Sequence, residues 1–157
     1  MRRTNVQGLL ASISDHGWVS QYFQVGDLVL WNPASRVAEL FFRTSEAIAP
    51  TMGLPTGIAP VVADEYQIDL DTFTAFTDAL VHRYLSSSHP ILRSLLEGFT
   101  ATALVMVERT GRSVPALADT PTLDPRDVSV GLAGISPLGD AERLRILAEE
   151  HARAMPV

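Results

Sequence analysis

Histidines and carboxylates carry most of the chemistry that this chain could perform, and one pair of them has a useful spacing. Asp78 and His82 lie four residues apart in a segment with helical periodicity, so they share one face of the expected helix. With one further ligand such a pair could hold a metal ion, and alone it could transfer a proton. The simpler reading is a hydrogen-bonded surface pair, since no HExxH pattern is present. We therefore assign no catalytic residue and expect neither a metal nor a cofactor.

The residue types that are missing narrow the chemistry further. The 157 residues include no cysteine, and all twelve basic residues are arginine. This excludes thiolate nucleophiles, disulfides, Schiff-base lysines and the P-loop lysine. Carboxylate, histidine or purely shape-based catalysis stays open. The absence of lysine also fits the codon usage of a GC-rich genome. We therefore attribute it to genome composition and not to function.

The acidic segment is the clearest charge feature. It holds five carboxylates within fifteen residues that contain no base: Asp64, Glu65, Asp69, Asp71 and Asp78. Acidic side chains at this point complement the dipole of the helix that follows, with Asp71 as its N-cap. The functional readings are a docking face for a basic partner or a hard-cation site, although the spacing matches no EF-hand loop.

The net charge of −6 limits the classes of partner. A nucleic-acid binder needs a basic stripe, and attachment to anionic lipid needs basic residues near the surface, so we expect no nucleic acid and no membrane as partners. No stretch approaches the ~20 apolar residues of a membrane span, and we expect a cytoplasmic protein. Only 19% of residues are charged, which is typical of a self-associating surface or of a GC-rich gene.

The first half of the chain predicts short strands and one helix. The β-rich runs within 21–31 flank Gly26-Asp27, which suits a type II′ hairpin or a bulge. Trp31, at the end of this strand, could line a small pocket or pack in the core. Asn32-Pro33 indicates a helix start, and Pro50 its end. An apolar stripe with helical spacing lies between them: Val37, Leu40, Phe41, Thr44, Ala47 and Ile48.

The second half predicts a strand at 64–70 and two further core helices. His89-Pro90 begins the last of these, which runs to about Arg109. Its early part is amphipathic, with an apolar face made of Ile91, Leu92, Leu95, Leu96 and Phe99. Residues 101–107 are apolar nearly all round, which is typical of a central, buried helix or a dimer interface. Asp140 is the expected cap of a terminal helix.

Together these patterns predict an α+β fold, with a small sheet of two or three short strands packed by three helices. We divide the chain into an N-terminal extension at 1–18, a globular α+β domain at 19–111, a proline-rich linker at 112–138 and a C-terminal helix at 139–157. The extension could lie upstream of a functional start near Val19, since an internal GTG codon reads as valine.

Several segments resemble a family of small actinomycete proteins of unknown function. The resemblance rests on Gln21 to Asp27, Leu30 to Pro33, Leu54 to Ile58 and His89 to Phe99, and it covers roughly residues 20–110. It implies a globular bacterial protein and brings no functional residue with it.

The leading functional hypothesis is a non-catalytic protein-interaction module, such as an immunity-type or neutralising protein that binds a basic protein partner. One alternative is a cofactor-independent small enzyme of specialised metabolism, of the cyclase or proton-transfer type, with Asp78, His82, Tyr66 or Tyr84 as its polar groups. The other is a self-assembling structural component, in which the partner is a second copy of the chain.

Overall fold

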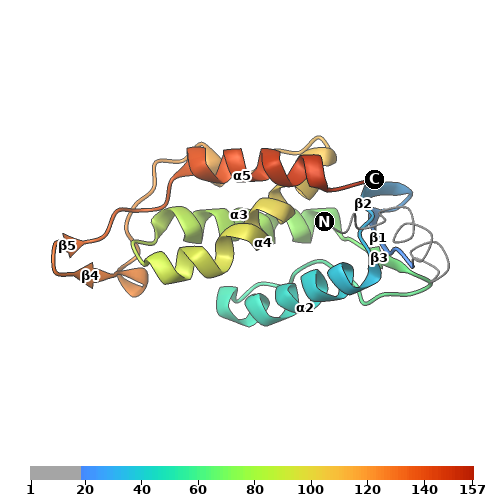
Figure 1. Cartoon of the computed structure of the whole chain (residues 1–157), viewed down its shortest axis with the longest axis horizontal. Coiled ribbons are helices and arrows are strands. Elements are labelled where there is room, and N and C mark those ends of the chain that lie inside the picture. The colour runs from blue at the N-terminus through green and yellow to red at the C-terminus, as the bar shows by residue number, and fades with distance from the viewer. Residues whose placement is uncertain (1–18) are drawn as a thin grey trace, which may run out of the picture.

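The computed structural model describes residues 19–157; residues 1–18, which hold the predicted extension, lie outside the described residues. A bundle of helices is joined at one end to a small sheet (Figure 1). This confirms the predicted α+β class. The elements in chain order are β1 (Tyr22–Val25), β2 (Leu28–Trp31), α2 (Ser35–Met52), β3 (Glu65–Gln67), α3 (Leu70–Ser86), α4 (Pro90–Arg109), η1 (Pro115–Leu117), η2 (Pro125–Asp127), β4 (Val130–Gly131), β5 (Gly134–Ile135) and α5 (Ala141–Ala154).

The main sheet has three strands in the order β2-β1-β3. β1 and β2 form an antiparallel hairpin, and β3 pairs with β1 in parallel. The hairpin turn is the predicted Gly26-Asp27, where Gly26 has a φ of 56°. A positive φ at the first turn residue alone is the pattern of a type II′ turn, which glycine adopts without steric cost.

The helices form a layered bundle in which α4 is central. Figure 1 shows α4 beside α3, with α5 above both and α2 below. All side chains from Ala101 to Val107 are buried, as the all-round apolar pattern predicts. By length and composition α4 could also cross a membrane, but the core helix of a globular protein passes the same test, and this helix is mostly buried among its neighbours.

An aromatic cluster joins the sheet to the bundle. Phe23 stacks between Trp31 and Tyr66, at centroid distances of 5.5 and 4.5 Å. Phe41 of α2 meets Phe23 edge to face and stacks on Phe99 of α4 at 4.6 Å. Trp31 therefore packs in the core, and α2 is held against α4 at this point.

Two helix caps agree with the sequence, and the cap of α3 corrects it. The His89 Nδ1 accepts a hydrogen bond from the Leu92 amide, and the Asp140 carboxylate accepts one from the amide of residue 142. The cap of α3 is Asp69 instead of Asp71, because Asp69 has the extended backbone from which its carboxylate reaches the Thr72 amide.

Helix α2 starts and ends later than the prolines predict. It begins at Ser35 with no side-chain cap. It continues through Pro50 to Met52 and closes at Gly53, whose φ of 65° lets its amide donate to the Ala49 carbonyl. Pro50 removes one amide donor in the last turn, which the helix tolerates there.

The segment expected to be a linker, 112–138, follows the surface of α3. Two 3₁₀ turns, η1 and η2, lie along the helix, and the short β4–β5 hairpin projects from the far end (Figure 1). Three neighbouring serines hold its middle. The Ser86 carbonyl accepts from the Asp124 amide, the Ser87 hydroxyl donates to the Asp127 carbonyl, and the Ser88 hydroxyl accepts from the Ser129 amide.

Candidate functional site

Two carboxylates of the predicted acidic face on α3 bind residues 112 and 116 of the same chain. The Asp71 carboxylate accepts a hydrogen bond from Arg112 at 2.5 Å. The Asp78 carboxylate accepts one from the Ala116 amide at 2.8 Å. Asp69 is used as the helix cap. The carboxylates of α3 that sequence analysis offered to a partner therefore already have intramolecular partners.

The other predicted site residues lie apart from this face. Asp64 and Glu65 are exposed at the turn into β3, where Ala63 and Asp64 both have positive φ. Trp31 is only 8% exposed, inside the aromatic cluster. The seven candidates thus do not converge on one site.

Asp78 and His82 do share a polar pocket of about 550 Å³ between α3, the end of α2 and η2. His82 Nε2 lies 3.4 Å from the Ser86 hydroxyl oxygen. The rest of the wall consists of residues that were not predicted as part of this site: Thr51, Met52, Ala79, Arg83, Asp124, Arg126 and Asp127. The last three lie in the 112–138 segment, which was expected to be a linker.

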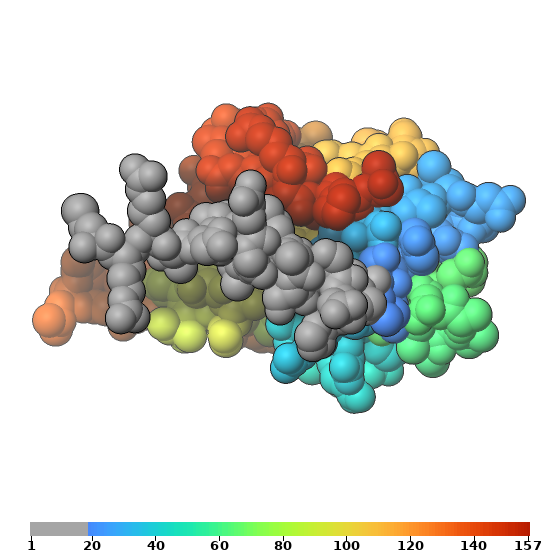
Figure 2. Space-filling view, turned by 45° about the vertical axis from the view of Figure 1, so that its right-hand side comes forward, coloured from blue at the N-terminus to red at the C-terminus, as the bar shows by residue number. Residues whose placement is uncertain are grey.

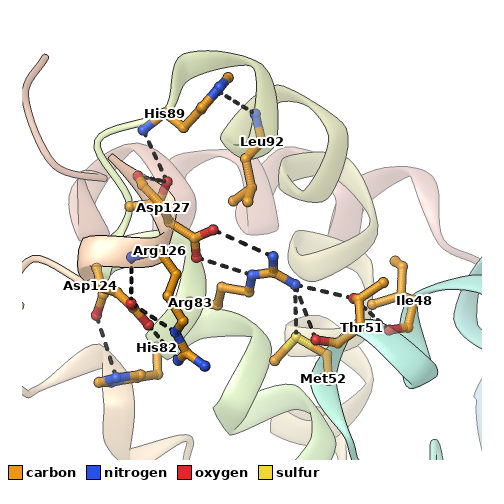
Figure 3. A network of polar contacts seen from close by, with 12 residues as sticks. Ile48, Thr51, Met52, His82, Arg83, His89, Leu92, Asp124, Arg126 and Asp127 are labelled. Atoms are coloured by element: carbon orange, nitrogen blue, oxygen red, sulfur yellow. Dashed lines mark hydrogen bonds and ion pairs between the residues drawn. The ribbon is translucent and has the colours of Figure 1, made fainter. Parts of the chain in front are cut away.

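Arg83 is the central side chain of this pocket. Figure 3 shows its guanidinium between Asp127 and the end of α2. Its Nε donates to Asp127 at 3.2 Å and its Nη1 donates to the Thr51 hydroxyl at 3.1 Å. The two charged side chains are mostly buried, at 27% and 10% exposure. Arg83 therefore ties α3 to both α2 and η2.

The second ion pair of the pocket is local. Arg126 donates to Asp124 through Nε and Nη2, at 3.0 and 2.7 Å. These hydrogen bonds, with one from the Arg126 amide, lower the pKa of Asp124 to about 2. A carboxylate with so low a pKa is a poor proton acceptor at neutral pH. Both arginines of the pocket are thus paired with carboxylates.

The tyrosines of the enzyme hypothesis lie elsewhere. The Tyr84 hydroxyl donates to Glu97 at 2.8 Å, and Arg143 of α5 binds the same carboxylate. Burial, helped by Glu97, raises the pKa of Tyr84 to about 12. Tyr66 stacks in the core and borders a different, smaller pocket. Asp78, His82, Tyr66 and Tyr84 therefore have no cavity in common.

An apolar groove of about 620 Å³ between α2 and the first turns of α4 was not predicted from the sequence. The helices touch through Phe41 and Phe99 and leave the groove beyond that contact. Ile91 and Leu95 are 64% and 75% exposed on one wall. Leu40, one turn before the other wall, is 68% exposed. The groove is lined by Arg43, Thr44, Ala47, Ile48, Thr51, Arg83, His89, Ile91, Leu92, Leu95 and Leu96.

The exposure of Ile91 and Leu95 corrects the predicted apolar face of this helix. Leu96 and Phe99 are buried as expected, but Ile91 and Leu95 point away from the core. The sequence did carry a signal. The apolar residues of the first turns cover more of the helix circumference than one buried face needs, and the excess faces solvent.

The fold and these surfaces define a small α+β protein with a closed polar network and an open apolar groove. The chain belongs to a family of unknown function (DUF6086), whose model matches residues 19–157. This confirms the predicted membership of an uncharacterised family and includes the segment beyond residue 110. No curated protein and no solved structure matches the chain.

Proposed function

We propose that this protein is a non-catalytic protein-interaction module that binds an uncharged, apolar protein segment in the groove between α2 and α4. The observation that carries the proposal is the groove itself, whose walls expose Ile91 and Leu95 while both helices are fixed to the core. A pre-formed groove between two helices is a common recognition site for an apolar peptide segment.

The charges around the groove favour an uncharged occupant. Within residues 19–157, no carboxylate lines it. Its two arginines are already engaged, Arg43 with Glu39 at 2.9 Å and Arg83 with Asp127. A charged side chain entering this groove would lose water without gaining an opposite charge, which costs free energy. An apolar segment meets no such penalty.

Exposed aliphatic side chains at the groove supply the free energy of binding. Fully burying a leucine or isoleucine side chain stabilises a complex by roughly 1.5–3 kcal/mol, and these are already about one-third buried. Ile91 and Leu95 in the groove, with Leu40 one turn beyond its α2 wall, therefore supply the core of an interface. Polar groups such as Thr44 and His89 lie at its edge.

The paired state of the polar pocket supports a non-catalytic role. Its arginines and the two carboxylates that they bind neutralise one another, and Asp78 is held by a backbone amide. A general base must be free to take a proton in the bound complex.

A second candidate is a basic protein partner, as for an immunity-type protein. Asp64 and Glu65 are exposed, and the net charge of −6 would attract such a partner. Binding at this end would weaken with salt, whereas binding in the apolar groove would not. An Asp64→Asn/Glu65→Gln variant that keeps its partner at low salt would contradict this second candidate.

Site-specific photo-cross-linking in cells that carry the native gene tests the groove. A photoreactive amino acid replaces Leu95 in one variant and Ile146 of α5, which is also exposed and apolar, in the control. We expect a protein adduct from position 95 only, with the label on an uncharged apolar peptide. Adducts of equal yield at both positions, or on a charged peptide, would contradict the proposal.

A further inference from the structure

The β4–β5 hairpin is an apolar arm that has no apolar partner within residues 19–157. Val130, Leu132 and Ile135 are all exposed, and Leu132 is fully so. The stretch from Val128 to Gly139 contains no charged residue. Exposed hairpins are normally protected by charges or prolines, and this one carries aliphatic side chains at its tip instead. Figure 1 shows the arm as the extreme end of the molecule, and its orange tip also marks one edge of Figure 2.

The base of the arm is held by hydrogen bonds, whereas its tip is exposed. Ser129 donates its amide to the Ser88 hydroxyl at 2.9 Å, and the Ser136 amide bonds to the Ser129 carbonyl at 3.1 Å. Arg93 of α4 donates to the Pro137 carbonyl just beyond the hairpin. One end of the arm is thus fixed to the connection between α3 and α4 and the other to the first turn of α4, which gives the tip a defined direction.

The same connection leads directly into the α2–α4 groove. His89 and Ile91, which follow Ser88, lie in the lining of the groove. Arm and groove therefore belong to the same end of the molecule. At about 3.3 Å per residue, the arm reaches roughly 10 Å from Ser129 to Leu132.

We propose that the occupant of the groove is the β4–β5 arm of a second copy of this chain, and that two copies exchange arms across a two-fold axis. The inference rests on the proposed function and names its partner. The two surfaces match in chemistry, because the arm is uncharged and apolar and the groove holds no unpaired charge among its lining residues. Because arm and groove lie at one end, a single two-fold axis can satisfy both copies at once.

Arm exchange would cover the exposed apolar side chains of both surfaces in each copy. Each copy would contribute one arm and one groove, so the aliphatic tip and the exposed Leu40, Ile91 and Leu95 would all be covered twice across the axis. In this dimer, Ile91 and Leu95 would no longer be exposed to water.

Cysteine cross-linking tests the exchange cleanly, because the chain has no cysteine of its own. Leu132→Cys and Leu95→Cys are made as separate single variants, and the purified full-length proteins are mixed and oxidised. We expect a disulfide-linked dimer that contains one copy of each variant. The control pairs Leu132→Cys with Ile146→Cys, which replaces an aliphatic residue on α5 that is 50% exposed. Equal cross-linking in the control pair would overturn the proposal.

Sedimentation velocity supplies the second measurement. The wild-type chain should sediment as a dimer, and Leu132→Asp should weaken the dimer by at least about thirtyfold, since a buried charge replaces an apolar anchor. The variant should keep the wild-type melting behaviour of its monomer, because Leu132 is exposed. A monomeric wild type, or a dimer that Leu132→Asp leaves unchanged, would overturn arm exchange. If the cross-linker at Leu95 then captured a different protein through an apolar peptide, the proposed function would stand without the exchange.

Discussion

Replacing Arg83 should destabilise the fold far more than replacing an arginine in an exposed ion pair. In Arg83→Met the aliphatic stem is kept, and the hydrogen bonds to Asp127 and Thr51 are lost. The Asp127 carboxylate, only 10% exposed, is left without its cation. Breaking a buried ion pair costs about 3–5 kcal/mol, and the partial exposure of Arg83 lowers our estimate to about 2–3 kcal/mol.

The matched control for this prediction is Arg43→Met. Arg43 pairs with Glu39 at 2.9 Å, but both side chains are more than half exposed. Such a pair is worth about 0–1 kcal/mol. Urea unfolding followed by circular dichroism gives both free energies of unfolding. In thermal melts, Arg83→Met should lower Tm by roughly 5–10 °C, at about 2–4 °C per kcal/mol. If the two variants lost the same stability within about 0.5 kcal/mol, the reasoning that η2 is anchored through Arg83 would be refuted.

Two further predictions concern stability. Gly139→Ala should lower the free energy of unfolding in urea by about 1–3 kcal/mol, because its new methyl group would lie 2.2 Å from the Tyr84 carbonyl oxygen. The control Gly131→Ala should be nearly neutral, because its methyl group meets nothing within 4 Å. Equal effects of the two variants would contradict the close packing at Gly139. Hydrogen bonds from Arg143 lower the pKa of Glu97, so this carboxylate stabilises the fold above its ordinary pKa of 4.5 and loses that effect as pH falls through the folded value. The stability gap between wild type and Glu97→Gln should therefore be full at pH 7 and close in acid, and a gap that does not change with pH would refute this.

The local signals in the sequence determined much of the fold. The run from Ala101 to Val107, apolar on all sides, predicted a buried helix. His89 and Asp140 were correctly predicted as the N-caps of α4 and α5. These features depend on neighbours a few residues away, which periodicity and capping rules describe well. The two-residue turn at Gly26-Asp27 belongs to the same class.

The candidate site depended on contacts that the sequence does not encode locally. Asp71 binds Arg112, which is forty-one residues later in the chain. Asp127 binds Arg83, from which it is separated by forty-four residues. Nothing in the composition of the 112–138 segment indicated that three serines would hold it. The groove was missed because a helical stripe shows which residues are apolar, but not which of them the neighbouring helix covers.

The most direct test of the central claim is the photo-cross-linking comparison between positions 95 and 146 in cells that carry the native gene. An interaction module with its contact surface in the α2–α4 groove predicts a protein adduct at Leu95 and none at Ile146, two side chains that are both exposed and aliphatic. An adduct of twice the chain mass would identify a second copy as the partner. No protein adduct at Leu95, under conditions in which the photoreactive group is shown to be active, would contradict the claim.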